Sequence, residues 1–131
     1  MLECLILGDS IAVGTHMARP ECVAYAKGGW NSWQWNKEYL DEDLSAKTVI
    51  ISLGSNDHQG VHTRQELYKL RGKIKADKVY WIMPAIKPEV QNIVEEVANM
   101  NGDFIITIPY LSKDGIHPTG NGYKKIAQIT K

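Results

Sequence analysis

Cys4-Leu5-Ile6-Leu7 is the first apolar run of the chain, and Gly8-Asp9-Ser10 follows it directly. Such a run is typical of a strand that is buried on both faces of a parallel sheet. Four later runs have the same character. The predicted strands are Glu3–Leu7, Cys22–Ala26, Thr48–Leu53, Lys78–Met83 and Phe104–Ile108.

Helical patterns alternate with these strands. The predicted helices are Ile11–Ala18, Ser32–Leu40, Arg64–Ile74, Glu89–Met100 and Gly120–Thr130. Five β-α units in succession predict an α/β domain. Right-handed crossovers limit its topology, and we expect a single flavodoxin-like three-layer domain over residues 1–131, with a five-stranded parallel sheet in the order 2-1-3-4-5.

Several helix ends carry recognisable signals. Pro88 is expected to start the fourth helix, and Asn101-Gly102 is expected to end it. Thr63 is a predicted N-cap of the third helix, with Glu66 completing a capping box. Thr119 is a predicted N-cap of the last helix.

Composition excludes several classes of protein. The chain of 131 residues is 44% hydrophobic and 23% charged, and 15 basic residues balance 15 acidic ones. No basic excess favours nucleic acid or an anionic membrane as a partner. No apolar run approaches the roughly 20 residues that a membrane span needs. Without a visible secretory signal, we expect a cytoplasmic location, with a phage or exported particle as the alternative.

The chain has two cysteines, Cys4 and Cys22, both in apolar runs. Free cysteine is among the most buried residue types, so we expect two buried free thiols. A disulfide is the alternative if the two strands are neighbours.

Polar and glycine-rich clusters follow four of the strands. They are Gly8-Asp9-Ser10, Gly28-Gly29, Gly54-Ser55-Asn56-Asp57 and Asp114-Gly115-Ile116-His117-Pro118. The carboxyl ends of parallel strands meet at one edge of a sheet, where such folds bind their ligands. The four clusters are therefore expected to form one site.

These clusters resemble the sequence blocks of the SGNH (GDSL-type) hydrolases. Gly8-Asp9-Ser10-Ile11-Ala12-Val13-Gly14 resembles the first block, and Gly29 the glycine of the second. Gly54-Ser55-Asn56-Asp57 matches the GxND block, and Asp114 to Pro118 the DxxHP block. The blocks occur in the family order over nearly the whole chain.

The resemblance implies a catalytic triad in which Ser10 is the nucleophile, His117 the base and Asp114 the carboxylate that orients the base. This chemistry is sound, because a serine hydroxyl becomes nucleophilic only when a neighbour takes its proton. Imidazole can take and return a proton near neutrality, and a carboxylate on its other nitrogen fixes the tautomer.

The resemblance also implies an oxyanion hole made by the amides of Ser10 and Gly29 and the side chain of Asn56. Gly28 is an alternative to Gly29. Trp30-Asn31-Ser32 stands where many members have Asp-Thr or Asp-Ser after the second-block glycine.

Further residues are candidates for substrate contact. They are Asp9, Trp30, Asp57 and Ile116. Asp57 is also expected to brace the loop that presents Asn56, and Trp30 to offer a wall to a sugar ring or an acyl chain. At least one tryptophan of Trp30, Trp33 and Trp35 is expected to anchor the second helix. His58 and His62 are interpreted as exposed loop residues, because a zinc site needs three or four convergent ligands.

The predicted function is a serine esterase that removes a short acyl group, acetyl above all, from a carbohydrate or a similar alcohol. No cofactor or metal is required. A short connection after the fourth strand, residues 84–88, predicts an open and shallow site. The alternatives are a lysophospholipase or thioesterase, an inactive flavodoxin-like binding module, and a phosphate-binding domain, which would lack the usual Gly-Lys-Ser/Thr signature.

Overall fold

The computed structural model describes all residues from 1 to 131. Its elements, in chain order, are β1 (Leu2–Gly8), α1 (Ser10–Ala18), β2 (Val23–Ala26), α2 (Ser32–Tyr39), β3 (Ser45–Ser52), α3 (Thr63–Lys73), β4 (Lys75–Met83), α4 (Pro88–Met100), β5 (Phe104–Thr107) and α5 (Gly120–Ile129). Every predicted strand and helix is present.

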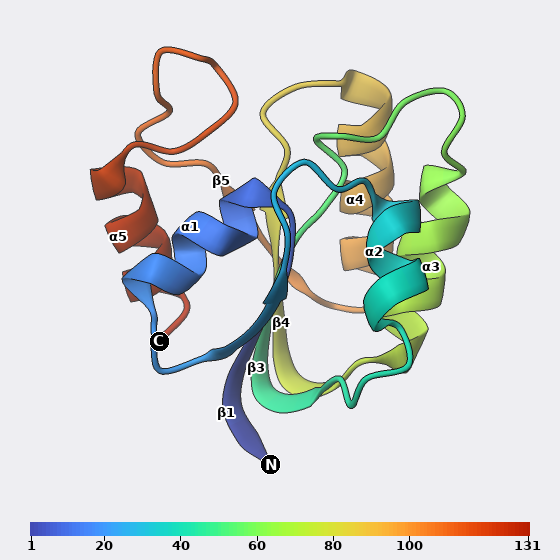
Figure 1. Ribbon diagram of the computed structural model, residues 1–131, viewed down its shortest axis with the longest axis horizontal. Helices are drawn as coiled ribbons and strands as arrows, with labels where there is room; N and C mark the ends of the chain where they lie inside the picture. The colour runs from blue at the N-terminus through green and yellow to red at the C-terminus, as the bar shows by residue number, and fades with distance from the viewer.

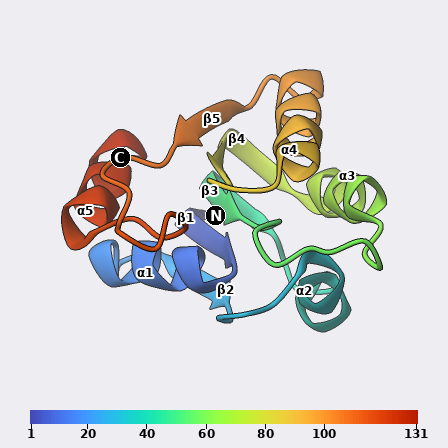
Figure 2. The ribbon, with the colours of Figure 1, turned by 90° about the horizontal axis from the view of Figure 1, so that it is seen from above.

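The five strands are all parallel and lie in the order β2-β1-β3-β4-β5, which confirms the predicted topology. Helices α1 and α5 cover one face of the sheet, and α2, α3 and α4 cover the other (Figure 1). The view from above shows the same three layers (Figure 2). No helix combines the length and the apolar character needed to cross a bilayer.

Each face of the sheet has its own apolar core, because successive side chains of a strand point to opposite faces. Leu5 and Leu7 of β1 belong to the core beneath α2, α3 and α4. Cys4 and Ile6 belong to the core beneath α1 and α5. Burial on both faces explains why β1 has an unbroken apolar sequence.

Strands β3 and β4 begin three residues earlier than predicted, at Ser45 and Lys75. These two residues are partners in the parallel ladder. Pairing requires only backbone groups, so polar residues at the amino ends of strands escape a prediction that relies on apolar runs.

The helix ends match three of the predicted signals and contradict one. Helix α4 begins at Pro88, as predicted. The Thr119 side chain accepts from the amide of Gly122, and Gly102 after α4 has a φ of +68°. Thr63, however, is not an N-cap. His62 occupies that position without a side-chain cap, and the Thr63 hydroxyl donates to Asp57 instead, at 2.7 Å.

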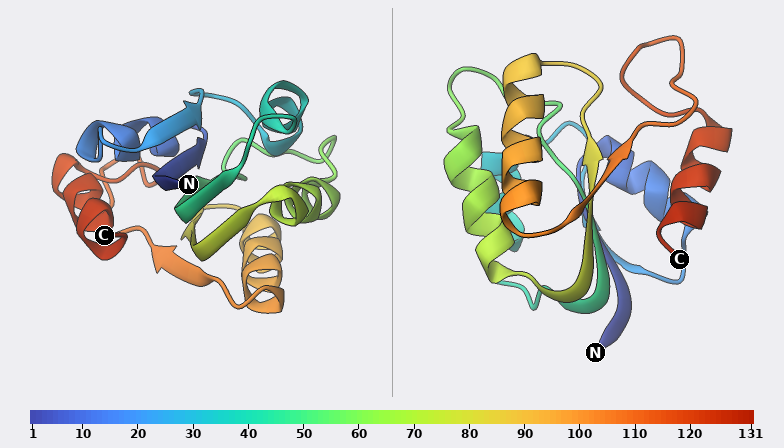
Figure 3. Two further views of the ribbon diagram at one scale, coloured as in Figure 1. Left: turned by 90° about the horizontal axis from the view of Figure 1, so that it is seen from below. Right: turned by 180° about the vertical axis from the view of Figure 1, so that it is seen from behind.

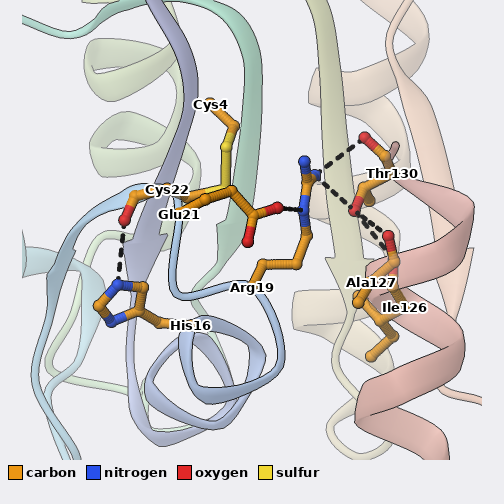
Figure 4. A network of polar contacts seen from close by, with 8 residues as sticks. All are labelled: Cys4, His16, Arg19, Glu21, Cys22, Ile126, Ala127 and Thr130. Carbon is orange, nitrogen blue, oxygen red and sulfur yellow. Dashed lines mark hydrogen bonds and ion pairs between the residues drawn. A yellow bond between two sulfur atoms is a disulfide. The ribbon is translucent and has the colours of Figure 1, made fainter.

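The cysteines form a disulfide, so the prediction of two free thiols is wrong. The parallel register pairs Leu5 with Val23, which puts Cys4 beside Cys22 with their Cα atoms 4.8 Å apart. That separation suits a disulfide. The bond lies beside the network in which Arg19 donates to the carbonyl and hydroxyl oxygens of Thr130, after the last helix (Figure 4).

The loops that follow the strands gather at one end of the sheet. The loop between β5 and α5 rises there, at the end where the loops after β3 and β4 also lie, and the N-terminus lies at the opposite end (Figure 3). The predicted site clusters therefore share one edge.

Candidate active site

Ser10 is the first residue of α1, and the end of β1 determines where it lies. Gly8 has a φ of +144°, and a Cβ there would lie 1.8 Å from the carbonyl oxygen of Ser52. Only glycine permits this approach of β1 to β3. The next amide, of Asp9, donates to the same carbonyl oxygen at 3.0 Å. The tight exit from the strand brings Ser10 to the carboxyl edge of the sheet.

The Ser10 hydroxyl meets the imidazole of His117, 107 residues further along the chain. The distance from Ser10 Oγ to His117 Nε2 is 2.8 Å, and that from His117 Nδ1 to Asp114 Oδ2 is 2.7 Å. The three side chains that the sequence predicted to converge thus form one continuous hydrogen-bonded chain. This is the arrangement of a nucleophile, a base and an orienting carboxylate.

A short closed loop presents both His117 and Asp114. The amide of Ser112 donates to the carbonyl of His117 at 2.8 Å, and Leu111 pairs with Pro118 in an antiparallel bridge. Asp114 Oδ1 accepts from the amides of Ile116 and His117, each at 2.8 Å. The loop therefore fixes the position of the Asp114 carboxylate through Oδ1, independently of the bond between Oδ2 and the imidazole.

These contacts hold the pKa of Asp114 well below its usual range. The largest cause is the hydrogen bond from the amide of His117, followed by that from the amide of Ile116, then the His117 side chain and the hydroxyl of Ser112. Hydrogen bonds to the charged form favour it. The carboxylate is therefore negative at every pH at which an imidazole can act as a base.

The site is open to solvent. The side chain of His117 is 37% exposed and that of Asp114 is 48% exposed. Ser10 is half-buried.

The groups predicted to form an oxyanion hole have N–H donors without an acceptor in the chain. The amide of Ser10 begins a helix and so lacks an intrahelical acceptor. The amides of Gly28 and Gly29 have no acceptor within the chain. The side chain of Asn56 donates from Nδ2 to the carbonyl of Trp30 at 3.0 Å, which leaves its second N–H free.

Of the two glycines, Gly28 is the one with a contact to Ser10. A Cβ on Gly28 would lie 3.7 Å from the Cβ of Ser10, whereas Gly29 has a φ of +81° and open space around it. The alternative between the two glycines, open in the sequence, stays open.

Asp9 and Asp57 are buried and make structural contacts; their predicted contact with substrate stays a prediction. Their residues are only 0% and 2% exposed. Asp9 caps α1 by accepting from the amide of Ile11 at 3.1 Å. Asp57 accepts from the hydroxyls of Ser32 and Thr63, at 2.6 and 2.7 Å, and so braces its loop as expected.

The tryptophans have separate surroundings. Trp35 is fully buried and anchors α2, its Nε1 donating to the carbonyl of Tyr25 at 2.9 Å. Trp33 is 48% exposed and lies beside Lys37. Trp30 and Ile116 are half-buried. Their contact with substrate stays a prediction.

Next to the Asn56 loop, and lined by neither Ser10 nor His117, is a hollow of about 740 Å³. His58 and His62 are exposed on its wall, as interpreted from the sequence. Lys87 also lines it, and its ammonium donates to the carbonyl of Asp57 at 2.6 Å.

Two features of this edge of the sheet were not predicted from the sequence. Asn31 and Gln34 form a capping box at the start of α2, which the spacing Asn-x-x-Gln could have revealed. Asn31 caps α2, and Ser32 donates to Asp57. These contacts account for the residues that stand after Gly29 and Trp30 in place of the usual Asp-Thr or Asp-Ser. Lys87 carries no signal in the sequence, because its role depends on a contact 30 residues away.

Comparison with solved structures finds the same fold. A proposed GDSL-like lipase from Parabacteroides merdae superposes with a TM-score of 0.72 at 15% identity, covering 98% of this chain and 93% of that one. A proposed acylhydrolase from Bacteroides fragilis gives 0.68 at 18% identity, with coverage of 96% and 83%.

The catalytic domain of peptidoglycan O-acetyltransferase A from Streptococcus pneumoniae, solved with a methylsulfonyl adduct, gives a TM-score of 0.60 at 17% identity, with coverage of 99% and 96%. The chain shares the fold of these three proteins. No protein-family model and no curated protein matches its sequence. At such low identities the likeness concerns the fold, and the chemistry must be argued from the site.

Proposed function

We propose that this protein is a serine esterase that hydrolyses a carboxylic ester through an acyl-enzyme on Ser10. One observation carries the proposal: the continuous hydrogen-bonded chain from Ser10 through His117 to Asp114, over 2.8 and 2.7 Å. The free amide of Gly28, close to Ser10, and the free N–H of the Asn56 side chain support it, because acyl transfer needs donors for a developing oxyanion.

The reaction begins when Ser10 Oγ attacks the ester carbonyl carbon and passes its proton to His117 Nε2. The carbonyl π electrons move to oxygen, and this oxyanion accepts hydrogen bonds from the amide of Ser10, from the amide of Gly28 or Gly29, and from Asn56 Nδ2. The C–O bond to the alcohol then breaks, and His117 gives its proton to the leaving oxygen. Asp114 stays ionised and stabilises the imidazolium.

Water completes the cycle. His117 takes a proton from a water molecule that attacks the acyl-enzyme, and a second tetrahedral intermediate forms. Its collapse breaks the bond to Ser10 Oγ, which recovers the proton from His117, and the free acid leaves. These steps require no cofactor or metal.

For the substrate we propose a short acyl group, acetyl above all, on a carbohydrate or a similar alcohol. The exposure of His117 supports a bulky alcohol, since the leaving oxygen must lie beside this side chain. The exposure of the Asp114 side chain beside it supports an open site for a short acyl group. One structural neighbour is described as an O-acetyltransferase of peptidoglycan, which agrees with acetyl as the acyl group.

The test of the nucleophile is labelling with a fluorophosphonate. The wild type should be labelled at Ser10, and Ser10→Ala should lose the label together with hydrolysis of a small aryl acetate. Ser45→Ala, at the amino end of β3, is the matched control and should behave as the wild type. Folded wild type that takes no label would instead favour the inactive binding module.

The acyl preference needs its own comparison. Rates on acetylated sugars, on short- and long-chain aryl esters and on acyl thioesters are measured side by side. Higher kcat/KM on acetyl esters is expected. A preference for long chains or thioesters would favour the lysophospholipase or thioesterase alternative.

A further inference from the structure

The connection between β4 and α4 contains a lysine in an unusual backbone conformation. Lys87, the N-cap of α4, has φ +67° and ψ +82°, and only one other non-glycine residue, Tyr110, has a positive φ. L-residues with side chains avoid this left-handed region. Such a conformation persists where the surrounding structure determines it, often beside a functional site.

The ammonium of Lys87 contacts the loop that follows β3. Its Nζ donates to the backbone carbonyl of Asp57 at 2.6 Å. Hydrogen bonds from a charged donor are shorter and stronger than neutral ones. The lysine is half-buried, so water competes less for this bond than at an exposed position.

Asp57 is one end of the turn that carries Asn56. Its amide donates to the carbonyl of Gly54 at 3.0 Å, which closes the turn. Gly54, at the other end, has a φ of +117°, and a Cβ there would lie 2.6 Å from Val90 Cγ1 and 3.4 Å from Pro84 Cγ. The segment from 84 to 90 therefore packs against one end of the turn and binds the other.

The direction of the Asn56 side chain depends on this turn. One N–H of its amide already donates to the carbonyl of Trp30, so the second can point at only a limited range of positions. An oxyanion donor must lie within a few tenths of an ångström of its working place. A turn free to shift would move the second N–H away from the oxyanion.

We infer that Lys87 is a positioning residue for Asn56: its ammonium, bound to the carbonyl of Asp57, holds the turn that aims the Asn56 amide at the oxyanion. The inference rests on the proposed function, since it names a further residue of the same site. It assigns a role to the β4–α4 connection, which the sequence suggested only as a short link.

The test compares Lys87→Met, Lys87→Gly and Lys87→Arg in hydrolysis of p-nitrophenyl acetate. Lys87→Met removes the ammonium, and kcat should fall between about 10- and 100-fold with KM within about twofold, because misplacing one group by about 1 Å can cost 10²-fold. Lys87→Gly should fall as far, although glycine adopts a positive φ freely. Lys87→Arg, which keeps charge and reach, should recover most of kcat.

These variants separate positioning from folding. A role limited to backbone conformation predicts that Lys87→Gly keeps full activity. The matched control is Lys125→Ala, an exposed lysine of α5, which should leave kcat unchanged. Folding is checked by circular dichroism and thermal unfolding.

Three outcomes would overturn the inference: folded Lys87→Met and Lys87→Gly with kcat within twofold of the wild type, Lys87→Arg as slow as Lys87→Met, or failure of every Lys87 variant to fold. Ser10→Ala distinguishes this failure from that of the proposed function. If Ser10→Ala stays active, the esterase proposal itself fails; if it is inactive while the Lys87 variants are fast, only the role of Lys87 is lost.

Discussion

Asp114 uses its two carboxylate oxygens for different tasks. Oδ1 accepts from two backbone amides and from the hydroxyl of Ser112, and Oδ2 alone binds the imidazole. Because the loop holds Oδ1, the direction of Oδ2 is fixed before substrate arrives. The imidazole of His117 is held in the tautomer that leaves Nε2 free to accept the proton of Ser10.

Replacement of Asp114 by asparagine should therefore damage the rate far more than the fold. The amide can still accept at one oxygen, but its NH₂ group favours the wrong tautomer of His117, and kcat/KM should fall about 10³- to 10⁴-fold. Steady-state kinetics on an aryl acetate measure the loss, with the exposed Asp77→Asn as control. A loss below about tenfold would contradict the role of Asp114.

The pH profile of activity gives a second check on the same residue. The depressed pKa of Asp114 means that this carboxylate loses its charge only far below neutrality. Asp114 should then add no titration of its own to the acidic limb. Log kcat/KM of Asp9→Asn, which lacks the buried acid whose pKa is about 6, should therefore fall with a slope no steeper than one as the pH decreases. A slope of two in this variant would show that Asp114 titrates in the same range.

At the scale of elements, helix α1 presents Ser10, the proposed nucleophile, and a buried acid caps its start. Asp9 caps the helix, and its second oxygen has no partner within the chain. Burial raises the pKa of Asp9 to about 6, although the hydroxyl of Ser52 and the amide of Ile11 oppose the rise. The start of α1 thus carries a carboxyl group whose charged form is disfavoured, because burial removes it from water.

The free energy of unfolding should reflect this burial. Between the unfolded pKa of 3.8 and the folded value of about 6, folded Asp9 binds a proton that the unfolded chain has released, so stability decreases as the pH rises through this window. Two pKa units correspond to about 3 kcal/mol.

In Asp9→Asn this dependence should disappear, because asparagine caps a helix nearly as well and carries no charge. Urea unfolding at several pH values should give a difference between variant and wild type that shifts in favour of the variant from about pH 4 to about pH 6 and is constant above. The exposed Asp41→Asn should show no such trend. A difference independent of pH would contradict the buried titration.

The helix caps also show where sequence information ends. Thr119 caps α5 as predicted, because the contact lies within four residues and depends on nothing else. Thr63 has the same local signal, yet its hydroxyl binds Asp57, which the fold brings into reach from the preceding loop. Local patterns decide a cap only when no buried carboxylate competes for the donor.

At the scale of the whole molecule, the sheet explains why the triad could be predicted. Ser10 follows β1, and Asp114 and His117 lie in the loop after β5, so strand order brings all three to one edge. The contact of Lys87 with Asp57 could not be predicted in this way. It depends on a side-chain direction and a positive φ, and no residue pattern near position 87 encodes either.

The disulfide was missed for a related reason. Its formation depends on the register between β1 and β2, and apolar runs do not determine register when both faces of a strand are buried. Disulfides persist mainly in oxidising compartments, so the bond argues against the cytoplasmic location expected from the sequence. The location of the protein itself stays a prediction.

The disulfide lies at the amino end of β1, whereas Ser10 follows the carboxyl end, and this separation makes a prediction about the whole molecule. Closing a loop between residues 18 apart should contribute about 3 kcal/mol to stability by restricting the unfolded chain. The double variant Cys4→Ala/Cys22→Ala and the reduced wild type should both unfold at lower urea concentration than the oxidised protein. The reduced wild type separates loss of the bond from the cavity that alanine leaves, since both cysteines are buried. Dithiothreitol should not affect the double variant further.

The activity of these proteins tests whether the disulfide matters to the site. Below the unfolding transition, kcat of the reduced wild type and of the double variant on an aryl acetate should equal that of the oxidised protein. A large fall in kcat while the protein is still folded would mean that the two ends of the sheet are coupled.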